Sequence, residues 1–142
     1  MPRPRYHAAL SLALAGLVVA RSRRWPDALP VLAAGVLVDV DHLVDLAATR
    51  ATRKTEWVIL PLHAWEWVFG LLTRRARPFD GLAGGLAAHL ALDQLNSAIG
   101  HPFFYWISVR AAYGFRARWP LIDPERFQRG ARWMAQSPRE WF

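Results

Sequence analysis

The sequence predicts an all-α integral membrane bundle of about four helices, followed by a C-terminal amphipathic helix. Long apolar stretches alternate with Arg-rich segments, and 54% of the 142 residues are hydrophobic. The apolar stretches carry few formal charges, all of them acidic, and several stretches are apolar nearly all round. There is no cysteine, which excludes disulfides and thiolate metal sites. A soluble all-α domain with buried ion pairs is the alternative.

Residues 1–110 are expected to form the bundle, and residues 111–142 a membrane-surface tail. Four stretches are candidate helices: 6–20, 28–49, 57–73 and 81–109. Gly100 and Pro102 are expected to divide the last stretch into a helix and a shorter aromatic piece. The first stretch would span about 22 Å, less than a hydrocarbon core of about 30 Å. Its basic start also fits a signal peptide that is cleaved near Ala20.

The charge of the chain indicates an anionic partner. The formal net charge is +7, carried by seventeen arginines and one lysine. This suits an anionic membrane surface or a nucleic acid. No nucleic-acid-binding motif is evident, which favours membrane lipids as partners. The distribution of basic loops then predicts that both termini of such a multi-pass protein lie in the cytoplasm.

The last thirty residues mix arginines with aromatic residues. The segment Asp123-Pro124-Glu125 is a good helix start, with Asp as N-cap and Pro at the first position. Phe127, Ala131 and Met134 would then form an apolar stripe. The pattern predicts an amphipathic helix on anionic lipids, although arginines between aromatics could also hold single-stranded nucleic acid.

A polar cluster interrupts the second apolar stretch. Its members fall within one side of a helix: Asp39, Asp41, His42 and Asp45. Charged groups in an apolar helix are costly unless they are paired, face a wet cavity or hold a metal. The cluster therefore indicates a site, although Asp45 could instead pair with Arg50.

Two further histidine–carboxylate pairs occur along the chain. His63 and Glu66 are three residues apart and would share a helix face. His89 and Asp93 are four apart, on a stripe that also contains Asn96 and the glycines of a GxxxG pattern, Gly81 and Gly85. A His and an Asp at this spacing can chelate one metal, and GxxxG lets a neighbouring backbone approach closely. A local hydrogen bond is the simpler interpretation of each pair taken alone.

Taken together, the three segments predict a metal site. Three independent buried ion pairs would be costly in so short a chain, whereas one or two divalent cations would explain all of them. Nitrogen and carboxylate ligands without sulfur suit Zn²⁺ first, and also Mn²⁺, Fe²⁺ or Mg²⁺.

Two of these segments resemble a known family. DVDH at 39–42 and GLAAHLALDQLNS at 85–97 are similar to the small inner-membrane proteins described as membrane-bound metal-dependent hydrolases, the YdjM-type family. Val38 stands where that family usually has proline, and LHAWEW around His63 lacks its His-Arg and Thr-His-Ser pieces. The resemblance covers about residues 30–110. It implies a metal-dependent activity and a place in the cytoplasmic (inner) membrane of a bacterium or archaeon.

The function expected from these observations is metal-dependent hydrolysis of a lipid or other amphiphilic ester or phosphoester near a membrane face. Glu66 is the candidate general base. The expected metal ligands are Asp39, Asp41, His42, His63, His89 and Asp93. A proton- or metal-conducting membrane protein and a non-enzymatic scaffold subunit are the alternatives, and oligomerisation is possible.

Overall fold

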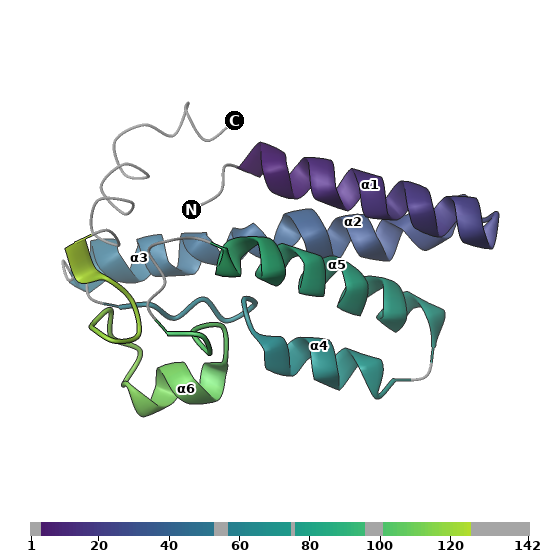
Figure 1. The fold of residues 1–142 in the computed structure, drawn as a ribbon. Helices are drawn as coiled ribbons and strands as arrows, with labels where there is room; N and C mark the ends of the chain where they lie inside the picture. The colour runs from purple at the N-terminus through teal and green to yellow at the C-terminus, as the bar shows by residue number, and fades with distance from the viewer. Residues whose placement is uncertain (1–3, 53–56, 75, 96–100, 126–142) are drawn as a thin grey trace.

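The fold is all-α, which confirms the predicted class. The computed structural model describes residues 4–52, 57–74, 76–95 and 101–125 (Figure 1). The helices are α1 (Pro4–Ser22), α2 (Ala28–Val36), α3 (His42–Thr52), α4 (Trp65–Leu72), α5 (Arg77–Gln94) and α6 (Ile107–Ala112). There are also two 3₁₀ turns: η1 (Trp25–Asp27) precedes α2, and η2 (Leu37–Asp41) connects α2 to α3.

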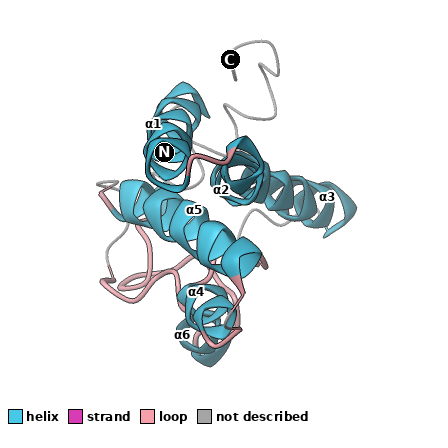
Figure 2. Cartoon of the chain, turned by 90° about the vertical axis from the view of Figure 1, so that its right-hand side faces the viewer, coloured by secondary structure: helices cyan, strands magenta, loops and turns pink. Residues whose placement is uncertain are grey.

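Helix α5 is the central element of the arrangement. Seen end-on, it lies between the α1/α2 pair on one side and α4 with α6 on the other (Figure 2). Its buried residues include both a small-residue contact surface and the two polar residues of the His-x-x-x-Asp pair. Pro78 stands in its first turn, where no backbone N–H is needed, and Asp80 follows it close to the positive end of the helix dipole.

The helices are shorter than the sequence predicts. The stretch 28–49 is divided by the 3₁₀ turn η2, and the stretch 57–73 is helical only from Trp65. Residues 57–64 run as an extended segment because their backbone groups bind side chains of other elements, as described below. Among the residues that the structure describes, no helix combines the length and the apolarity needed to cross a bilayer.

The GxxxG glycines of α5 contact α2, as their spacing predicts. A Cβ added to Gly81 would lie 3.0 Å from Pro30 Cβ. A Cβ added to Gly85 would collide with the backbone carbonyl of Val31, so the two helices touch backbone to backbone there.

Gly85→Ala should therefore destabilise the fold by about 1–3 kcal/mol, because the helices must separate. Gly84→Ala is the matched control, since nothing lies within 4 Å of a Cβ at that position. It should stabilise the protein by about 0.5–1 kcal/mol through helix propensity. Denaturant unfolding of the two variants measures both values; equal effects would contradict the close α2–α5 contact.

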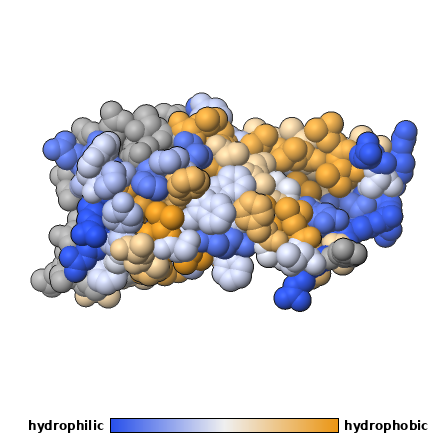
Figure 3. Space-filling view, turned by 60° about the horizontal axis from the view of Figure 1, so that its bottom comes forward, coloured by the Kyte–Doolittle hydropathy of each residue, from blue (hydrophilic) through white to orange (hydrophobic). Residues whose placement is uncertain are grey.

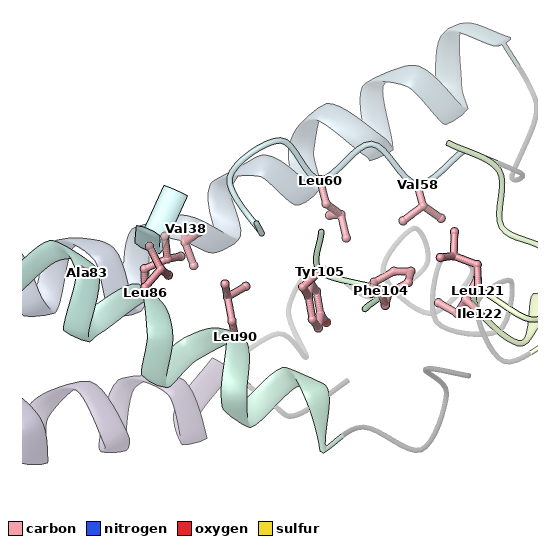
Figure 4. Packing of buried hydrophobic residues seen from close by; sticks show 11 residues of the cluster. Val38, Val58, Leu60, Ala83, Leu86, Leu90, Phe104, Tyr105, Leu121 and Ile122 are labelled. Atoms are coloured by element: carbon pink, nitrogen blue, oxygen red, sulfur yellow. The ribbon is translucent and has the colours of Figure 1, made fainter. Parts of the chain in front are cut away.

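The apolar core extends from the bundle into the C-terminal part of the described chain (Figure 4). Val38, Ala83 and Leu86 form one end of it. Leu121 and Ile122 lie at the other end, beside Val58. Residues 111–125 thus share a core with the bundle. The amphipathic helix predicted from Asp123 falls largely outside the described residues.

Candidate metal centre

The structure brings the six predicted ligand residues together in one buried place. Asp39 and Asp41 come from η2, His42 begins α3, His63 lies in the extended segment before α4, and His89 and Asp93 lie on α5. The three that are most deeply enclosed are Asp41, His63 and His89, each at most 1% exposed. The 3₁₀ turn explains how neighbouring acids of η2 reach the same centre from one short segment. That these residues bind a metal stays a prediction.

Four ligand atoms of this cluster lie at distances from one another that suit the ligands of a single metal ion. A zinc ion with ligands at about 2.0–2.1 Å has ligand–ligand edges of roughly 3.3–3.4 Å. The two histidine nitrogens, His63 Nε2 and His89 Nε2, are 3.1 Å apart. The remaining measured edges are His63 Nε2 to Asp39 Oδ1 at 3.4 Å and to Asp93 Oδ2 at 3.3 Å, and His89 Nε2 to the same atoms at 3.3 Å and 3.4 Å. Five edges thus have the lengths of a tetrahedral zinc site.

The far sides of both imidazoles are occupied by acceptors. His89 Nδ1 lies 2.9 Å from the carbonyl oxygen of Gly35, which requires that Nδ1 carries the proton and donates it. His63 Nδ1 lies 2.8 Å from Asp41 Oδ1, an ion-pair contact that does not have the geometry of a hydrogen bond. The contact with Gly35 fixes the tautomer of His89 and turns its Nε2 towards the other members of the cluster. Two histidine Nε2 atoms and two carboxylates thus face one another, and the carboxylates require positive charge beside them, from protons or from a cation.

The pKa shifts of the cluster residues also indicate that its carboxylates require positive charge beside them. Burial disfavours the charged form of His89, but the carboxylates of Asp39 and Asp93 outweigh it and raise its pKa to about 9. Burial alone would raise the pKa of both carboxyl groups, yet the histidines around them hold it far below the usual range. Without another cation, protons occupy the centre, and a metal has to displace them.

A fourth histidine, His7 of α1, belongs to the centre and was missed from the sequence. Its Nε2 lies 3.2 Å from Asp93 Oδ1, and its ring stacks on His89 with 3.9 Å between centroids. Its Nδ1 is buried without a hydrogen-bond partner in the described part of the chain. The signal that could have found it is a stripe of small and polar residues, because His7, Ser11 and Ala15 recur every four residues and are all buried.

The extended segment that carries His63 is held from two sides. Asp45 Oδ1 accepts hydrogen bonds from the N–H groups of Ile59 and Leu60, and Asp41 Oδ2 accepts those of Leu62 and His63. The guanidinium of Arg110 donates to the carbonyls of Ile59, Leu60 and His63, at 2.7–2.9 Å. These bonds replace the backbone pairs that a helix would have provided.

Asp45 and Arg110 therefore position the metal centre from outside it. The Asp45 carboxylate binds the backbone of the segment that carries His63. The sequence also suggested a pairing of Asp45 with Arg50, whose side chain lies outside the part of the chain that the structure describes. Arg110 has no exposed surface, and burial lowers its pKa despite the nearby Asp41 and Asp45 carboxylates. The segment is thus fixed by charged groups that are themselves buried.

Glu66 lies elsewhere in the structure than the sequence suggests. His63 precedes α4 and Glu66 is in its first turn, so the two do not share a helix face. Glu66 Oε1 accepts two hydrogen bonds from Ser108, one from its backbone N–H and one from its hydroxyl, each 3.0 Å long. It caps the N-terminus of α6. Asn96, the last member of the predicted α5 stripe, lies outside the described residues.

His42 is the cluster member nearest to solvent together with Asp39. Its Nε2 lies 3.5 Å from Asp39 Oδ1, and the two side chains are 18% and 30% exposed. Every other histidine of the cluster is at most 3% exposed. Solvent therefore reaches the centre past Asp39 and His42.

The fold and the site define a helical protein with a buried four-histidine, three-aspartate centre. Comparison with protein-family models, with curated proteins and with solved structures returned no match.

Proposed function

We propose that this chain is a metal-dependent hydrolase whose divalent cation, Zn²⁺ first, is held by Asp39, His63, His89 and Asp93. The spacing of 3.1–3.4 Å between the two histidine nitrogens, and from each of them to both carboxylate oxygens, carries the proposal. The Nδ1 contacts of the two histidines support it independently. The donor set of nitrogen and carboxylate oxygen suits zinc, and it also accepts Mn²⁺ or Fe²⁺.

The chain's own residues supply the remaining chemistry of hydrolysis. When bound, such a cation lowers the pKa of a water molecule and polarises the scissile carbonyl or phosphoryl group. Asp39 lies at the solvent side, so a shift of its carboxylate opens room for substrate. His42 stands beside Asp39 and accepts or donates the proton, a role that replaces the one expected for Glu66. The Asp41 carboxylate, 2.8 Å from His63 Nδ1, favours a proton on that nitrogen by its charge.

The proposed substrate is an amphiphilic ester or phosphoester met at a membrane. Large apolar side chains are exposed on α1, α2 and α4; examples are Leu12, Leu17, Leu29, Phe69 and Leu72, each more than half exposed. Figure 3 shows an apolar band, formed by hydrophobic surface gathered over part of one face of the molecule, with strongly hydrophilic residues beyond it at one end. Exposed apolar surface of this kind is typical of a membrane-contacting surface. Multi-pass insertion, with both termini in the cytoplasm, stays a prediction.

Membrane association predicts the behaviour of the protein on cell fractionation. The protein should pellet with membranes and resist extraction by alkaline carbonate, because the apolar band makes contact with lipid tails. Immunodetection in the two fractions measures this. Full recovery in the supernatant before carbonate treatment would remove the membrane from the proposal but leave the metal centre untouched.

Elemental analysis of the purified protein tests the metal. One zinc, manganese or iron ion per chain is expected, with loss of ester or phosphoester hydrolysis on chelation and its return when the ion is added back. Protein that contains no metal after purification, and that binds none on titration, would overturn the proposal.

A structural metal in a non-enzymatic membrane subunit is the second candidate. The observation in its favour is that four protein ligands can close a tetrahedral site, as structural zinc sites do. Stoichiometric metal without hydrolysis of any ester or phosphoester would select this candidate.

A further inference from the structure

An apolar groove of about 320 Å³ lies between α2, α4 and α5. The residues that line it are all apolar; they include Ala33, Leu37, Val38, Leu62, Trp67 and Leu86. Its size is at the lower end of the range for small-molecule sites, about 300–1,000 Å³, and far below what a folded partner needs. The volume suits a single extended chain of about ten carbons, at roughly 30 Å³ for each water-sized group.

The groove adjoins the metal centre through three separate elements. Val38 immediately precedes Asp39 in η2, and Leu62 immediately precedes His63. Leu86 lies one turn before His89 on α5, and it packs with Val38 (Figure 4). Two of these lining residues are thus adjacent in the sequence to a residue of the cluster, and the third lies one helical turn from one.

The outer wall of the groove is exposed to solvent, and a hydrogen bond holds one of its side chains, Trp67, in place. Leu37, Leu62 and Trp67 are 64%, 41% and 51% exposed. The indole Nε1 of Trp67 donates a 2.8 Å hydrogen bond to the carbonyl of Pro61, which fixes the ring at the groove without using its apolar face. A chain can therefore enter from the side, and nothing polar in the lining would have to be desolvated.

We infer that this groove holds the alkyl chain of the substrate, with the ester or phosphoester group at Asp39 and His42. The inference rests on the proposed function, because the metal centre places the head of the substrate. It names a single-chain amphiphile of about ten carbons as the preferred ligand. The end of a longer chain leaves the groove at its open side and adds no further affinity.

Binding of n-alkyl phosphates of four to fourteen carbons tests the inference, with the protein held in a detergent-free amphipathic polymer and loaded with zinc. Affinity should rise about fourfold for each added methylene and level off near ten carbons. Ala33→Phe should flatten this series, because the ring fills the groove. Trp67→Ala should move the plateau to longer chains. Ala13→Phe, at an exposed position of α1, is the matched control and should keep the wild-type series.

The same titration separates this inference from the proposed function. If inorganic phosphate and butyl phosphate bind only to zinc-loaded protein, but added methylenes change nothing, the groove assignment is wrong and the metal centre stands. If the chain-length series persists without any dependence on zinc, the groove stands and the metal-dependent head site falls. Identical series in wild type and in an Ala33→Phe variant that retains its zinc would also overturn the groove.

Discussion

His89→Ala should release the metal from the purified protein. His89 supplies one of the four proposed ligand atoms, and alanine leaves no donor in its place. Loss of a group that only orients a ligand costs about 10–100-fold in metal affinity, so removal of the ligand itself should cost more than 100-fold. Asp93→Asn should have a comparable effect, because the neutral amide is a poor ligand and the charge balance of the centre changes. Competition titration with a zinc chelator measures the affinity of each variant.

The chain offers a matched control for each of these substitutions. His101 is a partly exposed histidine outside the cluster, and Asp80 is an exposed aspartate on the same helix as Asp93. His101→Ala and Asp80→Asn should therefore keep wild-type zinc affinity. Asp41→Asn is the graded case, since Asp41 contacts His63 Nδ1 and should cost 10–100-fold. If His89→Ala bound zinc as tightly as His101→Ala, the four atoms of Asp39, His63, His89 and Asp93 would not be the metal site.

The convergence of the polar residues could be predicted because it follows from an energetic rule. Charged groups in apolar segments need partners, and three such segments in a short chain have few ways to satisfy one another. The contact of Gly85 with α2 followed from the GxxxG spacing in the same way. For these features local sequence and tertiary structure agree, so the all-α class and the clustering of Asp39, His63 and His89 could be read without coordinates.

The extended segment and the role of Glu66 could not be predicted, because long-range partners decide them. Residues 57–64 are apolar enough to be helical, but Asp45 and Arg110, far away in the sequence, bind their backbone groups instead. Glu66 pairs with Ser108, 42 residues further along the chain. Helical periodicity carries no information on such pairs. His7 was missed for a different reason, since a single histidine without a neighbouring acid has no local motif.

Arg110→Met should lower the free energy of unfolding by roughly 3 kcal/mol or more, and it should also weaken zinc binding at the metal centre. Methionine resembles the aliphatic part of arginine but donates nothing to the carbonyls of Ile59, Leu60 and His63. A buried carbonyl left without a donor costs about 1–3 kcal/mol, and Asp41 and Asp45 also lose a neighbouring positive charge. Against a total stability of about 5–15 kcal/mol this is a large share. Chemical denaturation gives the free energy of unfolding of each variant.

Arg110→Lys and Arg116→Met show whether the hydrogen-bond fork of Arg110 is responsible. Lysine keeps the charge but lacks the planar fork that reaches three carbonyls at once, so it should recover only part of the lost stability. Arg116 is exposed, and its replacement by methionine should change stability by less than about 0.5 kcal/mol. Because Arg110 binds the carbonyl of His63 itself, Arg110→Met should also weaken zinc binding, whereas Arg116→Met should not. A folded Arg110→Met protein with unchanged stability and unchanged zinc affinity would show that Asp41 and Asp45 alone hold the His63 segment in place.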